Sequence, residues 1–263
     1  MTEEDKGPRL SPSRLQTFAS CSHAYYLEKI VGAPQRQAVW FIQGTAVHAG
    51  IEAYEKSHRT LSVDGALDHF YMAWGRELRL AQEEQPDEDM WMVGGRRKLA
   101  TDIDKRHEMG EQQVADYILQ HPADGPLRPA EIIPGEPAVE VGFQLDFDGF
   151  RVIGYIDCVF EDQNGLWFPV DWKTGSKLPV DPYQLATYGV ALEELTGEKV
   201  PWGAYWDCRN NELVTKELTN YPREVVGEWY RRFHEGRKND IYLPNPGESC
   251  FTCTVRPACQ FAA

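Results

Sequence analysis

The spacing of hydrophobic residues changes about halfway along the 263-residue chain. In the first half, apolar residues recur every three or four positions, which predicts helices over residues 11–32 and 44–56 and further helices within residues 62–122. Ser11 or Ser13 is placed to cap the first of them. The acidic segment EEQPDEDM interrupts the last stretch and predicts a loop. The N-terminal half is therefore expected to be a block of helices.

After Pro137 the pattern shifts to alternation of apolar and polar residues, which is typical of strands with one buried face. The Asp-Gly pair at residues 148 and 149 predicts a turn between the first two strands. Helical spacing returns after the third strand, a hairpin follows, and a last helix precedes a tail rich in proline, glycine and cysteine. The expected elements are strands at 138–147, 150–161 and 166–173, a helix at 182–195, a hairpin of 200–209 with 212–218, and a helix at 223–237.

This order of elements predicts an α/β fold in which the N-terminal helices cap a sheet. We expect one domain over residues 1–263 rather than two independent domains, because the helices form an insertion ahead of the sheet. The insertion is expected at about residues 57–130 and the core at about residues 136–237.

The composition bounds the class of protein. The chain carries 27 Lys and Arg residues against 41 Asp and Glu residues, a formal charge of −14. This balance argues against general affinity for nucleic acid, although a local basic groove is compatible with it. The sequence has no apolar run near the roughly 18 residues that a membrane helix needs, and its charged N-terminus lacks the apolar segment of a secretory signal. We therefore expect a cytoplasmic protein.

The segment VDWKTG carries the first candidate chemistry. Successive side chains of a strand point to opposite faces, so Asp171 and Lys173 are predicted to share one face. Asp157 lies in GYID on the preceding strand, and antiparallel pairing would place it close to Asp171. Two close carboxylates repel each other unless a cation joins them, and hard oxygen ligands of this kind suit Mg²⁺ or Mn²⁺. Such an ion can activate a water for attack on a phosphate, with Lys173 neutralising the developing charge. A plain surface pair of Asp and Lys would show the same pattern without any chemistry.

Two helical pairs strengthen the catalytic interpretation. Gly44 and His48 are four residues apart, so the imidazole lies over a position without a side chain, where the helix can approach the sheet closely. Gln184 and Tyr188 share one face of the helix after the third strand, and their polar groups could hydrogen-bond a bound nucleic-acid strand. Each pair also has a structural interpretation, as a hydrogen-bonded core histidine and as a buried tyrosine.

The cysteines suggest a second metal site. The chain contains Cys21, Cys158, Cys208, Cys250, Cys253 and Cys259. The last three form a tight C-x2-C-x5-C cluster, and clustered thiolates in a reducing compartment usually hold a metal. The first cysteine, at the other end of the chain, is the candidate fourth ligand. Zn²⁺ and an iron–sulfur cluster both accept thiolates, and one remote cysteine with this triplet is less typical of zinc. The second and third cysteines fall within apolar strands and are expected to be buried in the core.

In this order, GTAVH, GYID, VDWKTG and QLATY resemble the motifs of the RecB-like branch of the PD-(D/E)XK nucleases. The divided set of cysteines is similar to that of the iron–sulfur members: the CRISPR-associated RecB-like exonucleases of the Cas four family, including phage-encoded members, and the AddB-type nuclease domain. The resemblance runs from Cys21 to Cys259 and implies a PD-(D/E)XK restriction-endonuclease-like core. That core is a mixed central sheet flanked by helices, here with an N-terminal helical region and a C-terminal iron–sulfur loop. The family's proline before the first aspartate is replaced by Ile156, and no G-x-x-x-x-G-K-[ST] motif is present, so no helicase activity is implied.

The resemblance also implies a role for each matching residue. His48, Asp157 and Asp171 would bind the catalytic Mg²⁺ or Mn²⁺, with the Trp172 carbonyl as a further ligand. Lys173 would be the catalytic lysine. Gln184 and Tyr188 would hold DNA near the metal. A [4Fe-4S] cluster would be held by Cys21, Cys250, Cys253 and Cys259.

Together these roles imply a metal-dependent DNA exonuclease that acts on single-stranded ends or overhangs, in recombination, repair, phage DNA metabolism or CRISPR adaptation, with protein partners in a recombination or CRISPR complex. A non-catalytic subunit that binds DNA ends is one alternative, which the intact set of His, Asp and Lys residues disfavours. A sequence-tolerant endonuclease is another. We expect cations to gather around the DNA-binding cleft, although most are expected on a solvated face. The available cations are Arg96, Arg97, Lys98, Lys177, Arg231, Arg232 and Arg237.

Overall fold

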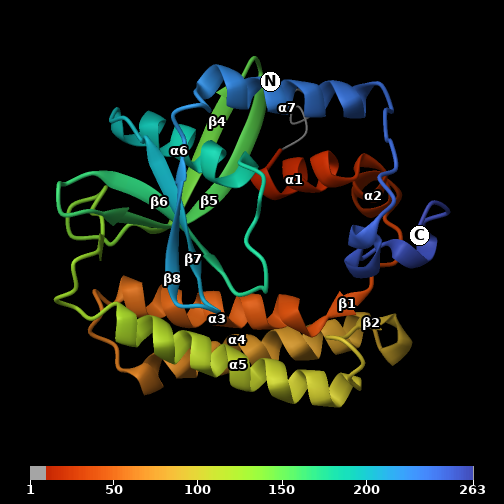
Figure 1. Ribbon diagram of the computed structural model, residues 1–263, viewed down its shortest axis with the longest axis horizontal. Coiled ribbons are helices and arrows are strands. Elements are labelled where there is room, and N and C mark those ends of the chain that lie inside the picture. The colour runs from red at the N-terminus through yellow and green to blue at the C-terminus, as the bar shows by residue number, and fades with distance from the viewer. Residues whose placement is uncertain (1–9, 263) are drawn as a thin grey trace, which may run out of the picture.

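A curled, mixed β-sheet lies at the centre of the computed structural model, which describes residues 10–262, with helices on both faces of the sheet (Figure 1). The helices are α1 (Pro12–Ser20), α2 (Ser22–Tyr25), the π-helix η2 (Tyr26–Val31), α3 (Val39–Lys56), α4 (Val63–Glu84), η3 (Glu88–Met90), α5 (Leu99–Gln120), α6 (Tyr183–Thr196), α7 (Arg223–Lys238), η4 (Glu248–Thr252) and η5 (Arg256–Ala258). The strands are β1 (Gln37–Ala38), β2 (Trp91–Met92), β3 (Arg128–Pro129), β4 (Val139–Phe147), β5 (Phe150–Glu161), β6 (Trp167–Lys173), β7 (Trp202–Asp207) and β8 (Glu212–Glu217).

The large sheet has the strand order β3-β5-β6-β7-β8, and β4 pairs with β5. Helix α6 links β6 to β7, which run parallel, whereas the other neighbouring strands of this sheet are antiparallel. The turn between β4 and β5 has positive φ at Asp148 and Gly149, 53° and 91°, as the Asp-Gly pair predicts. The α/β fold with a mixed central sheet is confirmed, and the three predicted strands begin and end within one residue of β4, β5 and β6.

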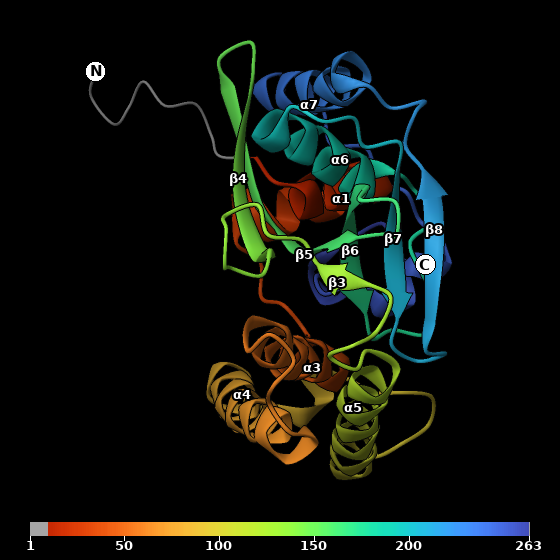
Figure 2. The same cartoon turned by 90° about the vertical axis from the view of Figure 1, so that its left-hand side faces the viewer.

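Each face of the sheet has its own apolar core. Helices α1, α6 and α7 cover one face, where Leu145 and Tyr230 are among the buried residues (Figure 2). Helices α3, α4 and α5 form the helical block on the other face, which buries Phe70 and Trp172. Since Trp172 points toward the helical block, its neighbours on β6 point toward α6. Asp171 and Lys173 therefore lie on the face of β6 that α6 covers, where both contact Gln184 of α6.

The first helix departs from its prediction. Ser11 caps α1 by accepting a hydrogen bond from the Arg14 N–H (3.3 Å), as expected. The predicted single helix over 11–32 is wrong, however, because the backbone at Cys21 is extended (φ −162°, ψ 100°) and separates α1 from α2. At the break the C-terminal tail contacts the chain, and the Asn245 N–H donates to Cys21 Sγ (3.4 Å). The spacing of residues around Cys21 does not indicate this long-range contact.

The helical block differs from its prediction in two places. Helix α3 begins at Val39, five residues before the predicted start. The acidic interruption is not a plain loop, because after Glu84 the chain forms η3 and then β2, which pairs in parallel with β1 through Gln37 and Trp91. Within the described residues, the helices are too short or too polar to cross a membrane.

Candidate active site

A cleft of about 920 Å³ lies beside α3 and the ends of β5 and β6. Its walls also include the segment that follows β6, the loop before α5 and the C-terminal tail. The cleft is the meeting point of the helical block, the sheet and the tail. The predicted site residues that line it are His48, Asp157, Asp171, Trp172, Lys173 and Gln184.

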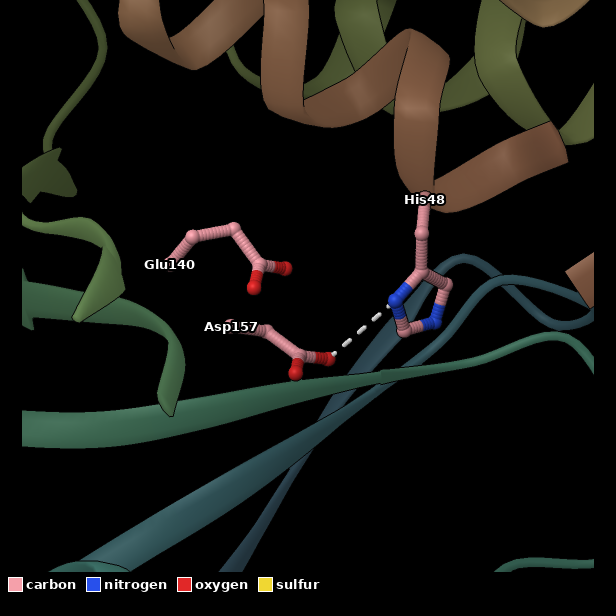
Figure 3. Close-up of side chains that lie close together, drawn as sticks. All are labelled: His48, Glu140 and Asp157. Carbon is pink, nitrogen blue, oxygen red and sulfur yellow. Dashed lines mark ion pairs between the residues drawn. The ribbon is translucent and has the colours of Figure 1, made fainter. Parts of the chain in front are cut away.

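Three residues from different elements converge in or beside the cleft, and we call them the metal group: His48 of α3, Glu140 of β4 and Asp157 of β5. One potential ligand atom of each lies within 4.8 Å of those of the other two. Figure 3 shows the imidazole reaching down from α3 toward the two carboxylates, with Nδ1 of His48 3.5 Å from Oδ2 of Asp157. Nitrogen and carboxylate oxygen at this spacing can share one divalent cation.

The Trp172 carbonyl fixes the orientation of the His48 ring. Its oxygen is 2.8 Å from Nε2, and because a carbonyl can only accept, Nε2 carries the proton. Nδ1 is then left with its lone pair directed at the carboxylates, as metal binding requires. Burial lowers the pKa of His48, although Asp171 opposes this effect, so the neutral ring is favoured.

The acids beside His48 are electrostatically strained. Burial raises the pKa of Asp157 well above its usual range, and the Asp171 carboxylate raises it further. Burial also raises the pKa of Glu140. Two or three carboxylates that destabilise each other's charged forms are relieved by a cation of charge two. The donor set, two hard carboxylates and a neutral imidazole, therefore fits Mg²⁺ or Mn²⁺.

A second set of side chains, the lysine group, consists of Asp171, Lys173 and Gln184. Asp171 and Lys173 share one face of β6 as predicted, with Nζ 2.6 Å from Oδ2. The Gln184 amide joins them: its Nε2 donates to Asp171 Oδ1 (2.6 Å) and its Oε1 accepts from Lys173 Nζ (2.9 Å). The lysine ammonium is thus held at a fixed place in the cleft, beside the metal group.

The two groups are joined through the backbone of β6. The Trp172 N–H donates to Asp157 Oδ2 (2.9 Å), and Cys158 pairs with Val170, so Asp157 and Asp171 follow as the next neighbours across β5 and β6. The predicted proximity of these two aspartates agrees with this register. Asp171 itself belongs to the lysine group rather than to the closest set of ligand atoms.

The profile of the PD-(D/E)XK nuclease superfamily matches residues 9–260. The chain belongs to this superfamily. This membership indicates a metal-dependent nuclease that acts on DNA. The Gene 69 protein of Mycobacterium phage D29 is 31% identical over 266 residues, covering 97% of both chains. The Gene 69 protein of Mycobacterium phage L5 is 29% identical over 286 residues, covering 96% of both.

Sequence reasoning missed Glu140 in this PD-(D/E)XK nuclease. In the alternating pattern of residues 138–147, Glu140 looks like an ordinary exposed position of a strand. Glu140 lies between the pairs Val139–Cys158 and Val141–Ile156, and hence opposite Asp157. Its backbone has a positive φ of 53°, a conformation that non-glycine residues adopt at a cost of about 1 kcal/mol or more. The one sequence signal for this ligand is the acidic residue itself, Glu140, near the start of the strand that precedes GYID.

Two polar predictions differ in their outcome. Gln184 lines the cleft, whereas Tyr188 is buried and accepts a hydrogen bond from Gln184 Nε2 (3.0 Å). Burial raises the pKa of Tyr188, and Asp171 adds to the shift. Tyr188 therefore does not line the cleft but holds the Gln184 side chain in place through this hydrogen bond. At Gly44 the predicted close approach is mild, because an added Cβ would lie 3.4 Å from Thr174 Oγ1, an ordinary contact.

The four clustered cysteines converge as predicted. Cys21, Cys250, Cys253 and Cys259 line one cavity of about 300 Å³ at the side of the molecule where α1 meets the tail. Burial raises the pKa of Cys253, and the other three thiols contribute to the same shift. The remaining two cysteines are buried within the apolar core on the helical-block face, also as predicted.

Only some of the Lys and Arg residues available for the cleft lie in or beside it. Lys177 lines the cleft, and Arg97 pairs with buried Asp102 (2.9 Å) beside it. Arg231 and Arg232 instead pair with Glu228 on α7, on the opposite side of the sheet from the helical block. The side chains of Arg231 and Arg232 are 42% and 77% exposed, so both lie on a solvated face, as expected for most of these cations. Arg237 lies over the rings of Tyr25 and Phe233.

Proposed function

We propose that this nuclease is an exonuclease that uses Mg²⁺ or Mn²⁺ to remove nucleotides from single-stranded DNA ends or overhangs. The observation that carries the proposal is the convergence of His48, Glu140 and Asp157, of which His48 and Asp157 line one open cleft together with Lys173. This is a site for a cation and a phosphate together. The relatives encoded by phages support a role in phage DNA metabolism.

Each residue has a task that follows from its position. His48 through Nδ1, Asp157 and Glu140 would hold the ion, and Asp171 would complete its coordination. When bound, the ion would activate a water and offset the charge that develops on the scissile phosphate. Lys173 would donate to a phosphate oxygen or orient the attacking water.

Two further groups keep these residues in place. Gln184 fixes both Asp171 and Lys173, and Tyr188 fixes Gln184. The Trp172 carbonyl holds the His48 tautomer, and its action as a direct metal ligand stays a prediction. We also propose that residues 1–263 act as one nuclease domain, because the cleft is built jointly by the helical block, the sheet and the tail.

We propose that the cysteine cavity holds a [4Fe-4S] cluster rather than zinc. Four thiols line the cavity, and one remote cysteine with a C-x2-C-x5-C triplet is less typical of zinc. A cavity of about 300 Å³ between them leaves room for a larger group. Such a cluster would clamp α1 to the C-terminal tail.

The nuclease proposal is tested with 5′- and 3′-labelled single strands and Mn²⁺. We expect progressive shortening by the unmodified protein and a loss of activity of at least about 100-fold in Asp157→Asn and in Lys173→Met. Asp104→Asn and Lys216→Met, at exposed positions on α5 and β8, are the matched controls and should remain active. Full activity in both Asp157→Asn and Lys173→Met would contradict the assignment.

A circular single strand separates the two modes of cleavage. An exonuclease leaves the circle intact while it degrades the linear form of the same sequence. Cleavage of the circle at a comparable rate would make the protein an endonuclease.

The cluster proposal is tested by anaerobic purification. We expect a brown protein with broad absorption at about 400 nm and with iron in the ratio of a [4Fe-4S] cluster. Cys259→Ser should lose the colour, whereas Cys208→Ser, which changes a buried core cysteine, should keep it. A colourless protein with stoichiometric zinc would overturn the cluster.

A further inference from the structure

The wall of the cleft that belongs to the helical block carries aromatic rings. Trp40 and Phe41 lie in the first turn of α3 and line the cleft together with His48 and Asp157. Phe41 is 46% exposed, which is unusual for a phenylalanine, and its ring is 5.8 Å from that of Trp40 in an edge-to-face arrangement. Exposed aromatic rings in a DNA-cleaving cleft offer flat surfaces to which unpaired bases can stack.

A cation lies directly beside these rings. The guanidinium of Arg106, on α5, is 5.6 Å from the centre of the Trp40 ring and lines the same cleft. Its Nη1 donates to Gln43 Oε1 (3.0 Å), and Gln43 in turn donates to Gln113 (2.7 Å). Gln43 and Gln113 are almost completely buried. The guanidinium is therefore held in place by a rigid polar chain rather than extended freely into solvent.

This polar chain also reaches the catalytic strand. Gln113 Nε2 donates to the carbonyl of Thr174 (3.2 Å), the residue that follows Lys173. The position of Arg106 is thus fixed relative to the lysine group through two buried amides. A strand held by Arg106 would have a defined register at the metal group.

The charge around Arg106 is positive in a chain whose net charge is −14. Arg106 and Arg97 both lie near the buried carboxylate of Asp102, at 3.8 and 2.9 Å. Two guanidinium groups therefore share one carboxylate. The three side chains together carry a net positive charge, which attracts anions to this corner of the cleft.

We propose that this wall is a second strand-binding subsite, in which Arg106 binds a phosphate of single-stranded DNA and Trp40 and Phe41 stack against its unpaired bases. The proposal rests on the function proposed above and adds the surface that selects the substrate. A duplex buries its base faces against one another, so that only a single strand can present them to these rings. The subsite would hold the strand next to the nucleotide that is cleaved.

Binding without divalent metal tests the subsite independently of catalysis. The probe is a labelled oligothymidine in EDTA, with a blunt hairpin duplex of the same length as the competitor. We expect Phe41→Ala and Trp40→Ala each to weaken single-strand binding by roughly 5- to 100-fold. Tyr71→Ala, which removes an aromatic ring of similar exposure on α4, should leave the affinity unchanged.

The contribution of Arg106 is read from the salt dependence. Arg106→Gln should reduce the slope of log K against log salt concentration by about 0.7, the value for one phosphate contact on a single strand. Arg232→Gln, at a 77% exposed arginine side chain on α7, should not change the slope. Circular dichroism checks that each variant is folded, and Phe41→Ala keeps the test valid if Trp40→Ala fails to fold.

The outcomes separate the two proposals. Unchanged affinity in Phe41→Ala and an unchanged salt slope in Arg106→Gln would overturn the subsite even if the protein is an active nuclease. Equal affinity for the hairpin and the single strand would overturn it as well. Metal-free single-strand binding that depends on Phe41 and Arg106 would support the subsite even if Mn²⁺ produced no cleavage. The absence of cleavage would refute the nuclease activity and not the subsite.

Discussion

Removal of the Arg59 guanidinium should destabilise the helical block strongly. Arg59 and Glu55 form an almost fully buried ion pair at the end of α3, with side chains 3% and 0% exposed. Two guanidinium nitrogens donate to the carboxylate, at 2.7 and 2.9 Å, and a third donates to the carbonyl oxygens of Leu127 and Pro122. Arg59→Met removes all of these bonds at once.

The structure sets the size of the effect. Breaking a buried pair from one side leaves an uncompensated charge and costs about 3–5 kcal/mol. The Tyr117 hydroxyl still donates to Glu55 (2.6 Å) in the variant, so we expect a loss of about 4 kcal/mol in the free energy of unfolding at pH 8. Glu55→Gln combined with Arg59→Met should recover part of this loss, because no charge is then left buried.

The loss should depend on pH. Burial already raises the pKa of Glu55, and Arg59 opposes that rise. Without Arg59 the folded-state pKa exceeds the unfolded value by more, so the protonated form stabilises the variant at low pH and this stabilisation disappears as the pH rises. Arg59→Met should therefore be closer to the unmodified protein at pH 5 than at pH 8.

Urea unfolding at both pH values, followed by circular dichroism, measures these free energies. Lys56→Met is the matched control, because it breaks the half-exposed Glu52–Lys56 pair on the same helix and should cost about 0.5 kcal/mol or less. A loss below about 1 kcal/mol in Arg59→Met at pH 8, no larger than that of the control, would refute the reasoning.

Two other predictions concern the same helices. Gly110→Ala should lower the free energy of unfolding by about 1–3 kcal/mol, because the new Cβ would lie 2.5 Å from a ring carbon of Phe70. In Gly75→Ala the new Cβ meets no atom within 4 Å, so the free energy of unfolding should rise by about 0.5–1 kcal/mol. Urea unfolding in which both variants changed stability in the same direction would contradict this. Burial lowers the pKa of His121 from 6.5 to about 4, so the unfolded chain binds this proton first and its contribution of about 3 kcal/mol is lost as the pH falls from 6.5 to 4. His121→Phe should lack that part of the acid sensitivity between pH 7 and pH 4, and an unchanged pH dependence of unfolding would contradict the assignment.

The strands and most helices could be predicted from sequence because local signals specify them. Alternation of apolar residues and the Asp148–Gly149 turn locate β4 and β5 to within a residue. The break at Cys21 could not be predicted, since the tail residue that binds it lies at the other end of the chain. Nor could the pairing of β1 with β2, which depends on how α3 and α5 pack.

Some residues of the site could be predicted from local motifs, whereas others join it only through tertiary packing. The motifs around Asp157 and Lys173 are local, and their proximity follows from neighbouring strands. Glu140 joins them only because a left-handed backbone residue in β4 lies opposite Asp157. Arg106 reaches the cleft through the packing of α5 on α3, which no spacing along the chain encodes. The sequence thus predicts the residues of the catalytic motifs better than the residues that packing places around them in the cleft.

The central claim is that one divalent ion binds at His48 and Asp157. Electron spin echo spectroscopy of the protein loaded with one equivalent of Mn²⁺ tests it most directly, because an imidazole nitrogen bound to the ion modulates the echo. The account predicts a nitrogen modulation that disappears in His48→Gln and remains in His107→Gln, where the histidine lies on α5 beside Phe70 and Trp74. Bound Mn²⁺ without nitrogen modulation, or with a modulation that survives His48→Gln, would contradict it.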